Sequence, residues 1–148
     1  MRILNLLAVI LISFSAVAGA DEVADAKAEI TTVIEASYVN GAFNALDADA
    51  MRAGFHEDYS IFWADGEKIG KYPIATWADG VEKKKADPGF DPAANVWDHE
   101  LPMIDVSGGT AMAKVELSNE GKHVYTDYLL LLKFESGWRI VAKVYQEH

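Results

Sequence analysis

Three glycine-containing turns constrain the fold of this chain most strongly. They are Ser107-Gly108-Gly109, Asn119-Glu120-Gly121 and Glu135-Ser136-Gly137, and they separate segments that are each long enough for one strand. The segments are rich in β-branched and aromatic residues, and such strands alternating with glycine turns are typical of a β-meander. The sequence therefore predicts four antiparallel strands from Val96 onward.

The last two turns also predict the strand register. Each has two residues suited to a type I turn and then a glycine in the left-handed position, which is the pattern of a three-residue hairpin loop. With loops of that length, the predicted opposite pairs are Phe134 with Trp138, Asp127 with Tyr145 and Ala113, and Leu129 with Lys143 and Ala111.

Because strand side chains alternate, this register sorts the meander into two faces. Asp127, Leu129, Lys143 and Tyr145 share one face. The other face is polar at one end and strongly apolar at the end that carries Phe134, Trp138 and Ile140. Three helices can cover only one face of such a sheet, so we expect a homodimer through Phe134, Trp138 and Ile140.

The chain before the meander has the periodicity of helices. Apolar residues at helical spacing predict a first helix over residues 22–40, which Asn40-Gly41 would end. A second, short helix is expected from about Asp47 to Gly54, with Asn44 or Asp47 as its N-cap.

One strand and one further helix complete the predicted elements. The strand is expected at residues 59–63, with Asp65-Gly66 as the following turn. Residues 73–85 favour a third helix that has Pro73 in its first turn. Helices followed by a meander indicate an α+β domain.

These elements, in this order, resemble the cone of the nuclear transport factor 2-like (cystatin-like) superfamily. The segment Tyr125–Phe134, followed by Gly137-Trp138-Arg139-Ile140-Val141 and Lys143, resembles the putative lumazine-binding family within it. Tyr38-x-x-Gly41 and Phe55-His56-Glu57-Asp58 are similar to that family as well. The resemblance spans nearly all of residues 22–147.

The resemblance implies an α+β fold in which three N-terminal helices pack on a strongly curved antiparallel sheet around an internal pocket. The superfamily includes steroid isomerases, scytalone-type dehydratases, polyketide cyclases, and pure binding or dimerisation modules. The fold therefore narrows the architecture much more than the function.

Asp127 is the main candidate for chemistry. It lies in the middle of an apolar strand, where an unpaired carboxylate would be costly. Burial disfavours its charged form, whereas the ammonium of Lys143 would stabilise it. Three roles stay open: a structural network with Lys143 and tyrosines, ligand binding, or acid–base catalysis of the kind that the superfamily's isomerases perform with an aspartate and a tyrosine.

The histidines offer one further catalytic candidate and no metal site. His56 follows the second helix and could act as a general base at the pocket mouth, with a helix-end or turn contact as the alternative. His99 lies between Asp98 and Glu100, but consecutive strand residues point to opposite faces and cannot easily converge on one ion. The sequence has no phosphate-binding loop or nucleophile motif, so no cofactor is expected.

Aromatic residues fall on elements that would line or cover the cone. Together with one carboxylate and one amine, they suit a pocket for a flat heterocycle or a polyketide. Ordinary core packing is the alternative for each aromatic residue. The predicted ligand-binding residues are Tyr38, Phe55, Trp63, Trp77, Tyr125, Leu129, Lys143 and Tyr145.

The first twenty residues have the order of a signal peptide. Arg2 precedes an apolar stretch from Ile3 to Phe14, and Ala18-Gly19-Ala20 fits the rule for signal peptidase. We expect cleavage after Ala20, export to the periplasm or out of the cell, no later membrane association, and a single domain over residues 21–148. An uncleaved anchor or a buried first helix is the alternative.

Composition excludes several classes of function. The formal net charge is −10 and cysteine is absent from the sequence. The charge argues against nucleic-acid binding, and the lack of cysteine excludes disulfides and thiol catalysis. The sequence thus favours an exported homodimer that binds a small hydrophobic or aromatic molecule. A cofactor-free isomerase, dehydratase or polyketide cyclase with Asp127 as acid or base, and a non-catalytic dimerisation scaffold, are the alternatives.

Overall fold

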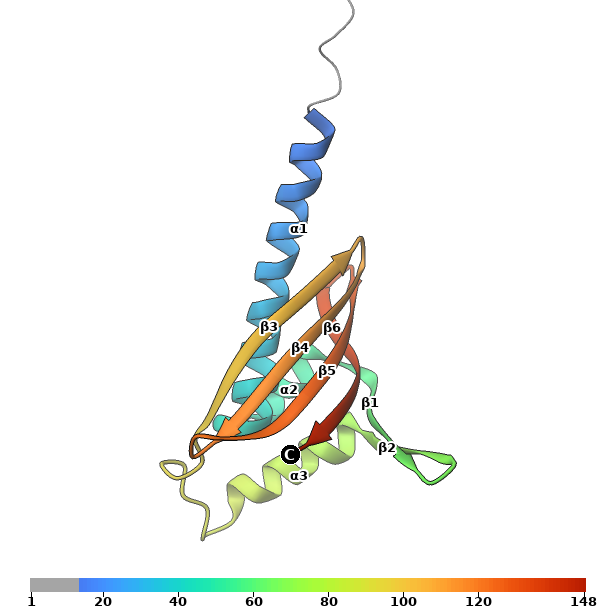
Figure 1. Cartoon of the computed structure of the whole chain (residues 1–148). Coiled ribbons are helices and arrows are strands. Elements are labelled where there is room, and N and C mark those ends of the chain that lie inside the picture. Colours follow the sequence, from blue (N-terminus) through green and yellow to red (C-terminus); the bar gives the residue numbers. More distant parts are fainter. Residues whose placement is uncertain (1–13) are drawn as a thin grey trace, which may run out of the picture.

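A computed structural model describes residues 14–148 of the chain (Figure 1). The first half contains α1 (Phe14–Val33), the π-helical η1 (Ile34–Asn44), α2 (Ala48–Gly54), β1 (Phe55–Asp65), β2 (Lys68–Pro73) and α3 (Ile74–Ala86). The second half contains β3 (Trp97–Ser107), β4 (Thr110–Asn119), β5 (Lys122–Phe134) and β6 (Gly137–Glu147). The predicted meander is thus confirmed.

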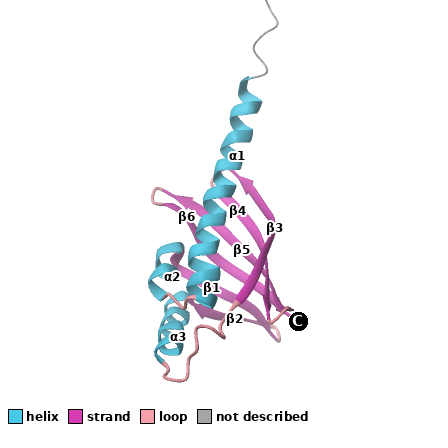
Figure 2. Ribbon diagram, turned by 90° about the vertical axis from the view of Figure 1, so that its left-hand side faces the viewer, coloured by secondary structure: helices cyan, strands magenta, loops and turns pink. Residues whose placement is uncertain are grey.

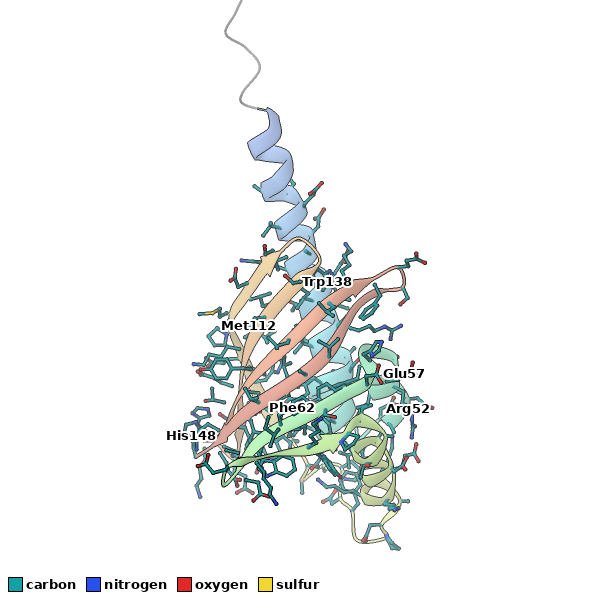
Figure 3. The ribbon with its side chains drawn as sticks, turned by 90° about the vertical axis from the view of Figure 1, so that its right-hand side faces the viewer. Arg52, Glu57, Phe62, Met112, Trp138 and His148 are labelled. Carbon is teal, nitrogen blue, oxygen red and sulfur yellow. The ribbon has the colours of Figure 1, made fainter. Side chains whose placement is uncertain are left out.

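The strands form one curved sheet in the order β2-β1-β6-β5-β4-β3. α1 lies in front of this sheet in Figure 2 and behind it in Figure 3, so the helices cover one face, and Figure 3 looks onto the other. The α+β fold is confirmed, but the sheet is mixed because β1 runs parallel to β6. The sequence did not predict β2, whose Lys68, Gly70 and Lys71 have low strand propensity and lie at the sheet edge.

The β5–β6 register is the predicted one at the centre of the hairpin and differs near the turn. Asp127 pairs with Tyr145, and Leu129 pairs with Lys143. Near the turn, however, Lys133 rather than Phe134 lies opposite Trp138, and the register shifts between Leu130 and Leu131. The predicted three-residue loop is therefore wrong: a two-residue loop and a β-bulge at Val141 give the same central register.

The bulge reverses the facing of the first part of β6. Trp138 and Ile140 are buried, with 3% and 0% of their surface exposed, instead of lying on an outer face. Trp138 lines a pocket together with Ala26 and Glu29 of α1. The predicted dimer surface is therefore wrong for Trp138 and Ile140, whereas Phe134 is 37% exposed.

The β4–β5 register differs from the predicted one by two residues. Asp127 pairs with Val115 instead of Ala113, and Leu129 pairs with Ala113 instead of Ala111. Because the difference is an even number of residues, each side chain keeps its predicted face. The turn has two residues, since Glu120 and Gly121 both have positive φ (52° and 73°), as a type I′ hairpin requires.

The first helix does not end at Asn40-Gly41 as predicted but continues as η1 to Asn44. Gly41 serves close packing there, because a Cβ atom at this position would lie 3.1 Å from Met51 Cγ of α2. Asp47 is the N-cap of α2, and its Oδ1 accepts hydrogen bonds from the backbone N–H groups of Asp49 and Ala50. One of the two predicted caps is thus confirmed.

Most of the predicted signal peptide lies outside the described residues. α1 runs through Ala18-Gly19-Ala20, and its N-terminal part projects beyond the sheet (Figure 1). Among residues 19–148, whose side chains are described, Ala26 is the first buried residue. Within residues 14–148, no helix has both the length and the hydropathy of a membrane span.

Candidate functional site

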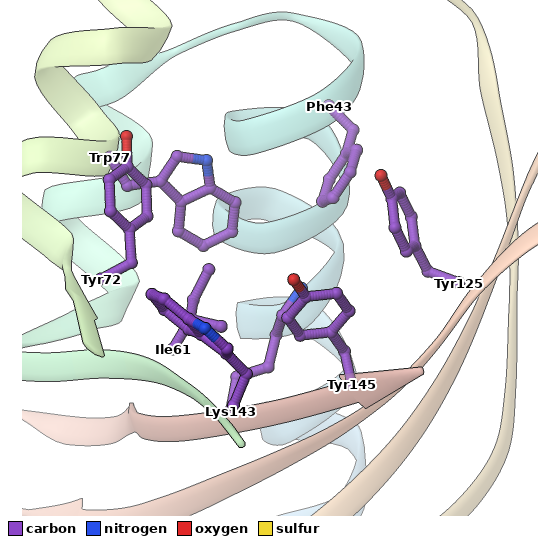
Figure 4. A pocket seen from close by; sticks show the side chains of 8 residues that line it. Phe43, Ile61, Tyr72, Trp77, Tyr125, Lys143 and Tyr145 are labelled. Carbon is purple, nitrogen blue, oxygen red and sulfur yellow. The ribbon is translucent and has the colours of Figure 1, made fainter. Parts of the chain in front are cut away.

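A cavity of about 340 Å³ lies between the sheet and the helices. Six elements contribute to its wall: η1, β1, β2, α3, β5 and β6 (Figure 4). The lining residues are Phe43, Ile61, Trp63, Tyr72, Trp77, Tyr125, Lys143 and Tyr145. The wall is thus mostly aromatic, with Lys143 as its amine.

A closed network of three buried side chains, Tyr38, Asp127 and Lys143, adjoins this cavity. Lys143 Nζ lies 2.9 Å from Asp127 Oδ1 as an ion pair. The Tyr38 hydroxyl donates a hydrogen bond of 2.5 Å to Asp127 Oδ2 and accepts one of 2.8 Å from Lys143 Nζ. Asp127 and Tyr38 are fully buried and Lys143 is 5% exposed. The ion pair between Asp127 and Lys143 is therefore shielded from bulk water.

The confirmed β5–β6 register places these groups together. Asp127 lies opposite Tyr145, and Lys143 lies two residues before Tyr145 on β6. All three side chains therefore lie on the helix-covered face of the sheet. Tyr38 of η1 contacts both Asp127 and Lys143, and its ring packs against the rings of Phe43 and Trp77.

Burial sets the protonation of the network. It lowers the pKa of Lys143, and the neighbouring Asp127 opposes this shift. It also raises the pKa of Tyr38 well above 10.0, and the Asp127 charge raises it further. The phenol consequently stays protonated and donates to the carboxylate, while the lysine loses its proton more easily than a surface lysine does.

Aromatic rings surround the Lys143 ammonium. Its Nζ lies 5.0 Å from the ring centroid of Tyr145, 5.1 Å from that of Tyr38 and 5.5 Å from that of Trp77. A cation within about 6 Å of an aromatic centroid is attracted by the ring quadrupole. These rings therefore offset part of the cost of burying the charge, and two of them, Trp77 and Tyr145, also line the cavity.

The predicted ligand-binding residues divide into two groups. Trp63, Trp77, Tyr125, Lys143 and Tyr145 line the cavity. Tyr38, Phe55 and Leu129 are not among its lining residues and are buried in the core. Phe43, Ile61 and Tyr72 also line the cavity but were not predicted from the sequence. If the first helix had been predicted to continue past Gly41, it would have included Phe43. Alternation along the predicted strand would have placed Ile61 on the same face as Tyr59.

His56 has a different environment. Its ring stacks on Phe134 at the end of β5, with 4.9 Å between the ring centroids and 15° between the planes. Its Nδ1 accepts a hydrogen bond of 3.2 Å from the backbone N–H of Asp58. Both residues lie at the start of β1, directly after α2, so the hydrogen bond is a local contact.

His99 does not form a metal site with its neighbours in the described structure. It lies 3.9 Å from Glu35 Oε1 instead. Residues 14–148 contain no group of three or more His, Asp or Glu side chains placed to hold a metal ion.

A family model described as putative lumazine-binding matches residues 25–146. The chain belongs to the putative lumazine-binding family. The match begins within α1 and ends one residue before the end of β6, so this family member carries the network and the cavity within its family domain. A comparison with proteins of curated function gives no match.

Solved structures place this putative lumazine-binding domain in the nuclear transport factor 2-like superfamily. An NTF2-like protein of unknown function from Shewanella baltica OS155 is 28% identical, with a TM-score of 0.66 over 84% of this chain and 95% of that chain. One from Methylobacillus flagellatus KT is 32% identical, with a TM-score of 0.63 over 84% and 93%. An NTF2-like protein with a cystatin-like fold from Novosphingobium aromaticivorans, 21% identical with a TM-score of 0.60 over 91% and 90%, supports the fold alone.

Proposed function

We propose that this protein binds a small aromatic or hydrophobic molecule in the cavity beside Lys143. The observation that carries the proposal is a buried ammonium on the wall of an aromatic cavity of about 340 Å³. Small-molecule sites are mostly apolar clefts of about 300–1,000 Å³ with few, well-placed polar groups. Aromatic walls stack on a flat ligand, and Lys143 donates a hydrogen bond to one of its polar atoms.

The family description suggests the shape of the ligand. Lumazine is a flat heterocycle that carries carbonyl oxygens and ring nitrogens. A ligand of this class would place a ring face against Trp77 or Tyr125 and an acceptor atom toward Lys143, which supports the same proposal on chemical grounds.

The geometry favours binding over acid–base catalysis by Asp127. The carboxylate is fully buried, and its two oxygens contact Tyr38 and Lys143. A ligand in the cavity would meet Lys143 first, because Lys143 lines the wall. For a molecule that binds without a covalent bond, Asp127 therefore acts through Lys143, by holding the ammonium in place.

Two tyrosines provide a matched test of binding. Tyr145 lines the cavity and is 39% exposed, whereas Tyr128 is 41% exposed on the outer face of the neighbouring strand. Tyr145→Ala should weaken binding of lumazine or 2-naphthol about tenfold, because it removes an aromatic contact of about 1.4 kcal/mol. Fluorescence titration measures this. Tyr128→Ala should leave the dissociation constant unchanged, and equal effects of the two substitutions would refute the site.

We further propose a homodimer through an outer apolar patch on β5 and β6. The patch consists of Tyr128, Leu130, Leu132, Phe134 and Val144, which are 37–50% exposed. Monomeric proteins rarely expose contiguous apolar patches of this kind. Phe134 belongs to this patch as well as to the predicted surface. Trp138 and Ile140, which are buried, do not belong to the patch.

Light scattering tests the dimer. Leu130→Glu places a charge in the centre of the patch and should convert dimers into monomers. Ile69→Glu is the control, because Ile69 is 72% exposed on β2, away from the patch. A dimer that survives Leu130→Glu would show that the sheet face is not the interface.

We also propose export of the chain after cleavage at Ala20. Among residues 19–148, Ala26 is the first buried residue, and it lies after the proposed cleavage point. N-terminal sequencing of the protein from its own organism should begin at Asp21. A sequence that begins at Met1 would reject this proposal.

A further inference from the structure

Lys143 combines three properties that lysines rarely share. It is 5% exposed, it lines the cavity, and its Nζ contacts both a carboxylate and a phenol. Figure 4 shows its side chain extending from β6 toward the aromatic rings. Hydrogen bonding to a ligand would use the charge of Lys143 but would need neither its burial nor the adjacent carboxylate of Asp127.

We propose that Lys143 forms a Schiff base with a carbonyl compound, an aldehyde or ketone with an aromatic or apolar body, that occupies this cavity. The inference rests on the proposed binding function and adds the chemical class of the ligand. Lysine amines attack carbonyl groups when they are desolvated and when their proton can be removed.

The neighbouring groups balance each step of the reaction. Lys143 Nζ first transfers a proton to Asp127 Oδ1, 2.9 Å away. The neutral amine then attacks the carbonyl carbon, a C–N bond forms, and a proton moves from nitrogen to oxygen to give a carbinolamine. Asp127 returns its proton to the carbinolamine hydroxyl, the C–O bond breaks, and water leaves. The sum is ammonium plus carbonyl giving a protonated imine plus water.

The site suits the product as well as the amine. The protonated imine carries one positive charge at the position of the ammonium, so the ion pair with Asp127 is conserved. The rings of Tyr38, Trp77 and Tyr145 still face a cation. The Tyr38 hydroxyl continues to donate to Asp127 Oδ2, which fixes the carboxylate as counter-ion to the iminium.

Burial supplies the reactive form of the amine. It lowers the pKa of Lys143 and so raises the fraction of neutral, nucleophilic amine. Lys143 is the buried lysine of the described core, and exposed lysines such as Lys68 and Lys122 serve as internal references in the same molecule.

Reductive trapping tests the inference on the intact protein. The protein is incubated with 2-naphthaldehyde and sodium cyanoborohydride and examined by intact mass spectrometry and peptide mapping. We expect one adduct that maps to Lys143 and forms faster than adducts at the exposed lysines. Lys143→Arg, which keeps a cation beside Asp127, should lose this adduct.

A competition experiment needs no variant. 2-Naphthylmethanol has the same ring system but cannot form an imine. In excess, it should slow labelling of Lys143 and leave labelling of the exposed lysines unchanged.

The outcomes separate the two proposals. Adducts spread evenly over the exposed lysines, together with titratable binding of the alcohol, would overturn the Schiff base and leave the binding function standing. Failure of both compounds to bind would overturn both proposals. Selective, competable labelling of Lys143 supports both.

Discussion

Asp127→Asn is expected to lower the free energy of unfolding by ~3–5 kcal/mol, because removal of one partner leaves a buried charge without compensation. The asparagine still accepts a hydrogen bond from Tyr38, but the Lys143 ammonium loses the carboxylate that lies 2.9 Å from its Nζ. Urea unfolding at neutral pH measures the loss. A change below about 1 kcal/mol, the size of a surface ion pair, would contradict the buried network.

The double variant Asp127→Asn, Lys143→Met is the control. It removes the unpaired ammonium together with its partner, and replacement of a buried ion pair by apolar groups is often nearly neutral. We therefore expect the double variant to be more stable than Asp127→Asn alone. Additive losses would mean that the two side chains contribute independently.

Trp138→Ala is expected to cost ~3–5 kcal/mol of stability and to leave the proposed dimer intact. The indole is 3% exposed beside α1. Its Nε1 has no hydrogen-bond partner in the described chain, so loss of packing sets the cost. Urea unfolding combined with light scattering tests both parts of the expectation.

Phe134→Ala is the matched control for Trp138→Ala. Phe134 lies four residues earlier in the same hairpin but belongs to the outer apolar patch, and it is 37% exposed. Its removal should cost only about 1 kcal/mol of stability and should weaken association. A small stability cost and weaker association for Trp138→Ala, with a large stability cost for Phe134→Ala, would contradict the observed register. It would support the register expected from the turn sequence, in which Trp138 faces outward.

The contrast between Trp138 and Asp127 shows how far the sequence predicts this fold. Glycine turns and residue alternation were sufficient to place Asp127, Lys143 and Tyr145 on one face. They were not sufficient for Trp138, because the bulge at Val141 leaves no turn-like signal in the sequence. Turn residues and side-chain alternation thus predict which strands pair, whereas the position of a β-bulge depends on the tertiary structure.

The candidate site was predictable to a similar extent. Trp63, Trp77 and Tyr125 were predicted because aromatic residues on pocket-facing elements are conspicuous. Tyr72 was not predicted, because its strand β2 is short, polar and at the sheet edge. The contact between Tyr38 and Asp127 joins residues 89 positions apart, and pairing at that separation depends on the folded topology.

The central claim is that the aromatic cavity beside Lys143 holds a small molecule. Native mass spectrometry of the protein purified from its own organism tests it most directly, with wild type, Tyr145→Ala and Tyr128→Ala prepared in parallel. We predict a bound small-molecule mass on wild type and on Tyr128→Ala, and a smaller fraction of ligand-bound protein for Tyr145→Ala. Empty protein in all three preparations, or a ligand that Tyr145→Ala retains in full, would contradict it.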